Sequence, residues 1–156
     1  DLVGHDRWRD LLLHGIHNSQ LAPGEWLDHQ RLDDFWKHGS VIEDWSAIEV
    51  PVLAVSGWAD GYTAAVFEMV EHLEAPCKGI VGPWGHKYPQ DGVPGPAIGF
   101  LQEATRWWDR WLRDRETGVE HDPAMRMWLQ ESHLPEGHIP QRRGNWIHFD
   151  EWTAAC

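Results

Sequence analysis

Two short apolar runs, each ending in glycine, place the strongest constraint on how this chain folds. The first is IEVPVLAVSG, residues 48–57, and the second is KGIVG, residues 78–82. Valine-rich runs of this length, without polar alternation, are typical of strands buried on both faces of a parallel sheet. Between them, apolar residues recur at helical spacing, namely Val66, Met69, Val70 and Leu73. Because parallel strands need such a crossover, the sequence predicts a βαβ unit and an α/β fold.

Each of these runs is followed by a tryptophan and a titratable residue. Asp60 follows the first run in GWAD, and His86 follows the second in GPWGH, 26 residues later. Ligands bind at the carboxyl ends of parallel strands, and this spacing fits one helical crossover, so we expect the two residues to be neighbours. An Asp that orients a His is the base half of a catalytic triad. On spacing alone, however, a non-catalytic interpretation is favoured over a triad. In that interpretation Asp60-Gly61 makes a simple turn, and His86, one of eleven histidines in the chain, follows its strand by chance.

Twelve tryptophans are the one unusual feature of the composition. Indole rings fill protein cores and also form walls of pockets for organic ligands. Trp58 and Trp84 follow the two strands, where we expect them to close the end of the sheet, with a substrate pocket as a second role. A later helix is expected to bury one apolar face, made of Leu101, Ala104, Trp108, Trp111 and Leu112.

The chain divides on its patterning into three segments. Residues 1–45 are helical in pieces, and residues 46–121 contain the βαβ unit and the later helix. From residue 122 onward, apolar and polar residues alternate through AMRMWLQES, which predicts the beginning of an antiparallel β region.

Charge and hydropathy exclude several functional classes. A formal charge of −12 repels nucleic acid and anionic membrane surfaces, so neither is an expected partner. We find neither a run of about 20 apolar residues nor the order of a signal peptide, which predicts a soluble protein. The two cysteines, Cys77 and Cys156, do not form the pattern of spaced pairs that indicates disulfides. The cellular compartment is therefore not determined, with the cytoplasm slightly favoured.

Several stretches together resemble the α/β-hydrolases of the X-Pro dipeptidyl-peptidase and cocaine esterase type. They are DDFWKHGSVIEDWSAIEVPVLAVSGWADGY, GIVGPWGHKYP, FLQEATRWWDRWLRDRETGVEHDPAMRMWLQES and GNWIHFDEW. The resemblance implies that Asp60 is the triad acid and His86 the triad base. It also implies that residues 1–45 are the remnant of a helical cap, that residues 46–121 end the hydrolase domain, and that residues 122–156 start a C-terminal β jelly-roll.

The chain departs from that family in one respect: it lacks a G-x-S-x-G nucleophile turn. Its serines are Ser19, Ser40, Ser46, Ser56 and Ser132, and none has the flanking glycines. We therefore expect a fragment of a serine hydrolase whose nucleophile precedes residue 1. Such a fragment is inactive alone and associates with itself or with the missing N-terminal half. The complete enzyme would cleave ester, amide or peptide substrates through an acyl-enzyme, without metal or cofactor.

Two other functional classes stay open. His5, His14 and His17 lie near Asp6 and Asp10 and are candidates for a metal-binding domain, although surface histidines are favoured because no recognisable zinc pattern is complete. Alternatively, the β segment could be a non-catalytic binding module that stacks a sugar or apolar ligand on Trp128, Trp146 and Trp152.

Overall fold

The computed structural model describes residues 4–19 and 22–153. The chain divides into two compact units, unit 1 (Asp1–Glu43) and unit 2 (Asp44–Cys156). Cys156 and the outermost residues of the first and last predicted segments lie outside the described residues. Among the helices of the described ranges, none is both long and apolar enough to cross a bilayer.

The described part of unit 1 is helical, as expected for the start of the chain. It contains α1 (His5–Asn18), α2 (Ala22–Asp28), α3 (Asp34–Lys37) and the 3-10 turn η1 (Val41–Glu43). Asp33 begins α3 as an N-cap, because its carboxylate accepts a hydrogen bond from the Phe35 backbone N–H. No described residue of this unit is buried, and Trp8, Leu11 and Ile16 expose half or more of their surface. The apolar face of α1 therefore gains no burial within its own unit.

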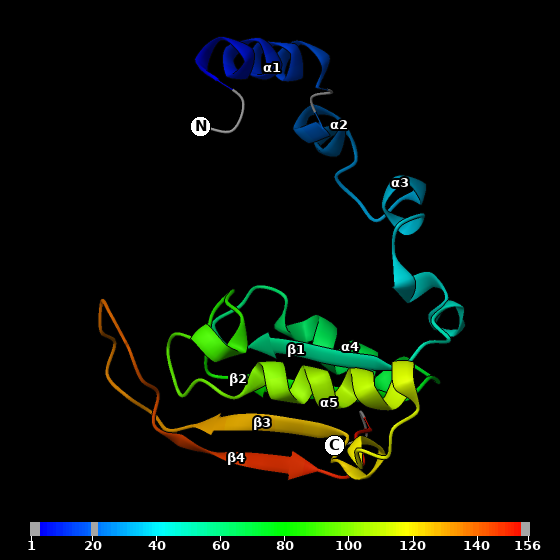
Figure 1. Ribbon diagram of the computed structural model, residues 1–156, viewed down its shortest axis with the longest axis vertical. Coiled ribbons are helices and arrows are strands. Elements are labelled where there is room, and N and C mark those ends of the chain that lie inside the picture. Colours follow the sequence, from blue (N-terminus) through cyan, green and yellow to red (C-terminus); the bar gives the residue numbers. More distant parts are fainter. Residues whose placement is uncertain (1–3, 20–21, 154–156) are drawn as a thin grey trace. The chain divides into compact units, whose positions relative to one another are not determined.

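Unit 2 is built around a sheet whose described strands lie in the order β1-β2-β3-β4 (Figure 1). The strands are β1 (Val52–Gly57), β2 (Cys77–Gly82), β3 (Met125–Gln130) and β4 (Gly144–Phe149). β1 pairs with β2 in parallel, and α4 (Thr63–His72) connects the two strands. This arrangement confirms the predicted βαβ unit and the α/β class. The remaining elements are η2 (Trp45–Ala47), η3 (Pro89–Asp91), α5 (Phe100–Arg113) and η4 (Val119–His121).

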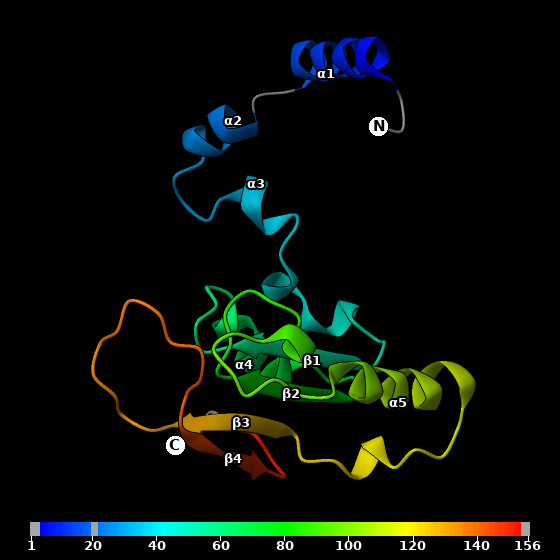
Figure 2. The same ribbon diagram turned by 60° about the vertical axis from the view of Figure 1, so that its left-hand side comes forward.

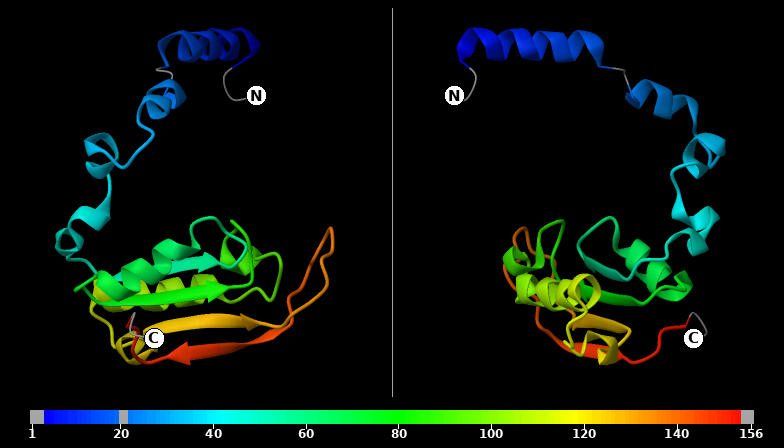
Figure 3. Two further views of the ribbon diagram at one scale, coloured as in Figure 1. Left: turned by 180° about the vertical axis from the view of Figure 1, so that it is seen from behind. Right: turned by 45° about the vertical axis from the view of Figure 1, so that its right-hand side comes forward.

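Two helices cover opposite faces of this sheet (Figures 1 and 3). Val66 of α4 packs on the face that carries Ala54, Val81, Met125 and Met127, and these form the hydrophobic core. The other face, which carries Leu53 and Ile80, lies against α5. Because successive side chains of a strand point to opposite faces, a continuous apolar run supplies both layers at once.

The buried face of α5 only partly matches the face expected from the sequence, in which Ala104 is buried as expected and Trp111 is half-buried. Ala104 and Trp107 are buried, whereas Leu101, Trp108 and Leu112 are 62%, 58% and 78% exposed. Apolar residues cover two adjacent stripes of this helix, and the helix turns the stripe through Ala104 and Trp107 toward the sheet. Periodicity alone cannot choose between neighbouring stripes of similar apolarity.

The segment after residue 122 adds to the same sheet. β3 pairs in parallel with β2, through Gly79 and Met125 among others, and only β4 is antiparallel to its neighbour. Figure 2 shows the long loop that joins these last two strands. In the described ranges the antiparallel region is thus a single hairpin at the edge of an α/β sheet. The expected jelly-roll stays a prediction.

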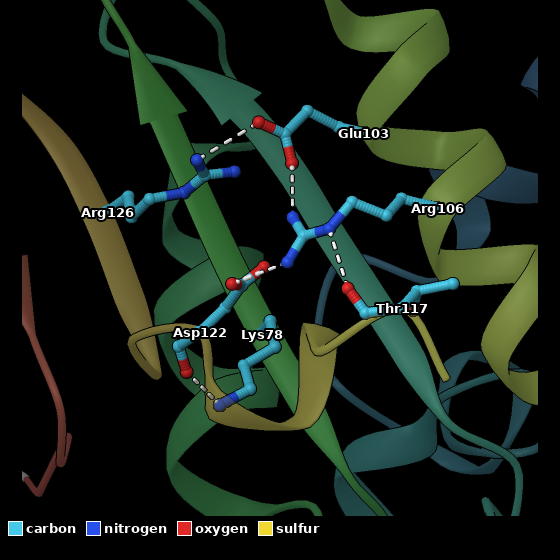
Figure 4. Close-up of polar contacts among 6 residues, drawn as sticks. All are labelled: Lys78, Glu103, Arg106, Thr117, Asp122 and Arg126. Carbon is cyan, nitrogen blue, oxygen red and sulfur yellow. Dashed lines mark hydrogen bonds and ion pairs between the residues drawn. The ribbon is translucent and has the colours of Figure 1, made fainter. Parts of the chain in front are cut away.

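A polar network joins α5 to the central strands (Figure 4). Its members are Lys78, Glu103, Arg106, Thr117, Asp122 and Arg126. The Arg106 guanidinium lies 2.8 Å from Asp122 Oδ1 and 3.5 Å from Glu103 Oε2, while Arg126 lies 3.1 Å from Glu103 Oε1. Lys78 donates a hydrogen bond to the backbone carbonyl of Asp122. These contacts tie the helix, β2, β3 and the segment after η4 together on one face of the sheet.

Candidate active site

The loops that carry the predicted site residues leave the sheet side by side. Gly57 and Gly82, the last residues of β1 and β2, are register partners in the parallel ladder. Beyond them, the Trp58 N–H donates to the Gly82 carbonyl at 2.8 Å, and the Ala59 N–H donates to the Trp84 carbonyl at 3.2 Å. The two loops are therefore joined by backbone hydrogen bonds before either reaches its titratable residue.

The glycine before each tryptophan is required by the close approach of these loops. A Cβ atom on Gly57 would lie 1.9 Å from the Trp84 carbonyl oxygen, and one on Gly82 would lie 2.2 Å from the Trp84 ring. No other residue type has room at either position. The repeated pattern of an apolar strand, a glycine and a tryptophan thus reflects one shared structure, in which the Trp84 indole packs over both strand ends.

Asp60 and His86 are hydrogen bonded to each other. His86 Nδ1 lies 3.0 Å from Asp60 Oδ2, which confirms that the two residues lie at the same edge of the sheet. The Asp60 side chain is 10% exposed, whereas the His86 side chain is 81% exposed. When the imidazole is neutral, this contact favours the tautomer with its proton on Nδ1, leaving the lone pair on Nε2. Within the described residues Nε2 has no partner, so it is available to accept a proton.

The Asp60 carboxylate is also held by its own turn. Its Oδ1 accepts a hydrogen bond from the Tyr62 backbone N–H at 3.0 Å. That N–H is the largest influence holding the pKa of Asp60 below its ordinary value; burial opposes it, and the contact with His86 adds to it. The Tyr62 ring lies near the imidazole, with centroids 5.8 Å apart. The acid is thus ionised and oriented at neutral pH.

A pocket of about 460 Å³ opens beside this pair. Asp60 and His86 form part of its polar wall, and Val55, Trp84, Tyr88 and Phe100 line it with apolar and aromatic surface. A mostly apolar cavity with a few polar groups at one side is the usual form of a site for a small organic ligand. The arrangement places a proton acceptor at the edge of a space that fits such a ligand.

Several residues of this site were not singled out by the sequence. Tyr88 and Phe100 line the pocket, but an aromatic residue in a loop or at a helix start carries no signal of that role. Ser56 also lines it and is buried; its hydroxyl lowers the pKa of Asp60, although it makes no hydrogen bond of ordinary geometry. Ser56 could have been suspected, since it is the one polar side chain in an otherwise apolar strand.

The two candidate tryptophans have different surroundings. Trp84 is 1% exposed and lines the pocket, so it combines sheet-end packing with a position at the cavity wall. Trp58 is absent from the residues that line this pocket. Its indole Nε1 donates to the Trp128 carbonyl at 2.7 Å and its ring lies 5.8 Å from that of Phe67. A contact of either ring with substrate stays a prediction.

The structure also describes the residues on which the two alternative functions, a metal site and a ligand-stacking surface, depend. Among residues 4–19 and 22–153, no group of three or more His, Cys, Asp or Glu side chains could hold a metal ion. Of the three tryptophans proposed to stack on a ligand, Trp128 is buried, Trp152 packs against the core, and Trp146 is 37% exposed. Neither alternative is favoured by these observations.

Comparison with known families shows which family the chain resembles. The family model for X-Pro dipeptidyl-peptidase (S15 family) matches residues 5–88, more than half of the chain. The chain belongs to the X-Pro dipeptidyl-peptidase family. The matched range of this S15 family chain contains β1, α4 and β2 and ends just after His86, and it indicates a function related to serine hydrolases. A comparison with curated proteins finds no match.

Proposed function

We propose that this chain supplies the acid and the base of a serine hydrolase that cleaves ester, amide or peptide bonds. The observation that carries the proposal is the hydrogen bond between the nearly buried Asp60 carboxylate and the exposed His86 imidazole. In a triad, the acid holds the imidazole in one tautomer and stabilises the imidazolium that forms. The match of the S15 family model over both residues supports the same function.

In the proposed reaction, His86 Nε2 takes the proton of a serine hydroxyl as that oxygen attacks the carbonyl carbon of the substrate. The imidazolium then returns the proton to the leaving alcohol or amine, and an acyl-enzyme is left. Water attacks the acyl-enzyme in the second half of the reaction, with His86 again as the base. Asp60 stays ionised throughout. Neither step requires a metal or an organic cofactor.

The nucleophile of this proposal comes from a segment with a G-x-S-x-G turn, which these 156 residues do not contain. We propose that the chain associates with such a segment or with a second copy of itself. The position of β1 at one edge of the sheet supports this, because an edge strand presents unpaired backbone groups. We further propose that the β3–β4 hairpin starts a jelly-roll domain and that the helices of unit 1 belong to a cap.

The experiment compares variants of a protein that contains this chain together with the nucleophile segment. Turnover of p-nitrophenyl acetate should fall by roughly 10⁴- to 10⁶-fold for His86→Ala and somewhat less for Asp60→Asn, because the base moves the proton and the acid orients it. His138→Ala is the matched control, because this histidine is exposed and is not among the residues that line the pocket. A folded His86→Ala protein with near-normal turnover would contradict the proposal.

A second measurement uses the chain by itself. Without a nucleophile turn, the 156-residue chain should not react with a fluorophosphonate probe, which labels activated serines. Stoichiometric labelling that disappears when one of its serines is replaced by alanine would show that the nucleophile lies within the chain.

A further inference from the structure

The turn between β1 and α4 contains a hydroxyl that contacts both of its ends. Thr63 Oγ1 lies 2.5 Å from the Gly57 carbonyl oxygen and 3.0 Å from the Asp60 carbonyl oxygen. The first of these carbonyls closes the strand, and the second belongs to the residue that faces His86. A threonine hydroxyl has a single proton, so it donates to one carbonyl or shares the proton between the two. When the proton is shared, one side chain bridges the turn from its start to the acid.

We propose that Thr63 is a positioning residue for the Asp60–His86 pair. The inference rests on the proposed function and deepens it, because it names the group that keeps the acid aligned with the base. Thr63 is not among the residues that line the pocket. It acts through the backbone of the turn that carries the carboxylate.

The connection runs through the peptide groups after Asp60. The carboxylate contacts His86 and accepts a hydrogen bond from the Tyr62 N–H, and the position of that N–H is set by the backbone between residues 60 and 62. Gly61 lies in that stretch, and a Cβ atom built on it would meet nothing within 4 Å. Side-chain packing therefore does not restrain this glycine, the residue type with the most conformational freedom. Fixing the Asp60 carbonyl fixes the peptide plane between Asp60 and Gly61, so only the two backbone torsions of Gly61 separate that plane from the Tyr62 N–H that orients the carboxylate.

A backbone hydrogen bond that closes the turn supports this assignment. The Asp60 N–H donates to the Gly57 carbonyl at 2.9 Å, which holds the amide side of Asp60. Thr63 holds the carbonyl side of the same residue, so the two bonds together clamp it at both ends. Threonine suits this task because its branched Cβ restricts rotation about χ1 and keeps the hydroxyl in place.

The test measures the tautomer of His86 in the whole 156-residue chain by ¹⁵N NMR of its imidazole. At about pH 9, well above the ordinary pKa of histidine, the ratio of the Nδ1–H to the Nε2–H form reports whether Asp60 holds Nδ1. Thr63→Val keeps the shape of the side chain and removes the hydroxyl. We expect it to lower the ratio by roughly two- to tenfold, the range for loss of one hydrogen bond. Thr63→Ser, which keeps the hydroxyl, should keep the ratio near that of the native chain.

Thr105→Val is the matched control. Thr105 also donates from its hydroxyl to a backbone carbonyl, that of Leu101 at 2.7 Å, but it lies on α5 outside the turn. Its loss should leave the His86 tautomer ratio unchanged. A fall as large as that of Thr63→Val would mean that general destabilisation is responsible, and would overturn the inference.

Asp60→Ala separates this inference from the proposed function. It should lower the ratio by roughly tenfold or more, since it removes a charged hydrogen-bond acceptor. If Asp60→Ala lowers the ratio and Thr63→Val does not, the role of Thr63 is refuted and the Asp60–His86 pair stands. If Asp60→Ala leaves the ratio unchanged, both are refuted. Should Thr63→Val fail to fold, Thr63→Ala decides: a reduced ratio supports the hydroxyl bridge, and a native ratio overturns it.

Discussion

Gly57→Ala should separate the two loops that carry Asp60 and His86. The added Cβ would lie 1.9 Å from the Trp84 carbonyl oxygen, far inside a van der Waals contact and against backbone that cannot swing away. Relief requires the loops to move apart. That movement breaks the hydrogen bonds from the Trp58 and Ala59 N–H groups to the second loop.

The cost follows from these two effects. Overpacking of this kind costs about 1–3 kcal/mol. Loss of two backbone hydrogen bonds adds about 0.5–1.5 kcal/mol each. The free energy of unfolding should therefore fall by about 2–6 kcal/mol, a large part of the roughly 5–15 kcal/mol that stabilises a domain. Urea unfolding followed by circular dichroism measures it.

Gly61→Ala is the control from the same loop. Nothing lies within 4 Å of its Cβ position, so it should not clash. Replacing a glycine at such a site changes the unfolding free energy by less than about 1 kcal/mol, and in the stabilising direction. If Gly57→Ala and Gly61→Ala unfold at the same urea concentration, the shared strand-end structure described above is wrong.

Three further substitutions test other parts of unit 2. Arg106→Met should lower the unfolding free energy by about 1–2 kcal/mol in urea titrations, because the Arg106 side chain, which is one-third exposed, contacts three partners. Arg113→Met is the control, because it loses one exposed ion pair on the same helix and should cost under about 0.5 kcal/mol. Trp107→Ala should cost about 3–5 kcal/mol by the same assay and Trp108→Ala less than about 1 kcal/mol, and equal losses would refute the orientation given for α5. The pKa of Asp60 is lowered on folding, so the ionised carboxylate stabilises the fold fully above its ordinary pKa of 3.8, and this stabilisation is lost as the pH falls through the folded value. Asp60→Asn should therefore flatten the dependence of the unfolding free energy on pH below about pH 4. An unchanged pH dependence would contradict this.

Local pattern predicted the part of the fold that positions the pair. The strands ending at Gly57 and Gly82 were recognisable because a buried parallel strand is apolar without interruption, and the helix between them because its apolar residues recur every third or fourth position. The approach of Asp60 to His86 followed from these elements, since neighbouring parallel strands end at the same edge. Their role in catalysis stays a prediction from the family resemblance and the geometry.

What the sequence by itself determined about this protein is its α/β class, the βαβ unit and the position of Asp60 and His86 at one edge of the sheet. These depend on contacts along the chain and between adjacent strands. Only the tertiary structure decided which stripe of α5 is buried, that β3 pairs in parallel with β2, and that the Thr63 hydroxyl bridges the turn at Asp60. Each of these depends on which surfaces meet once the elements have packed, and a linear pattern of apolar and polar residues is compatible with more than one such arrangement.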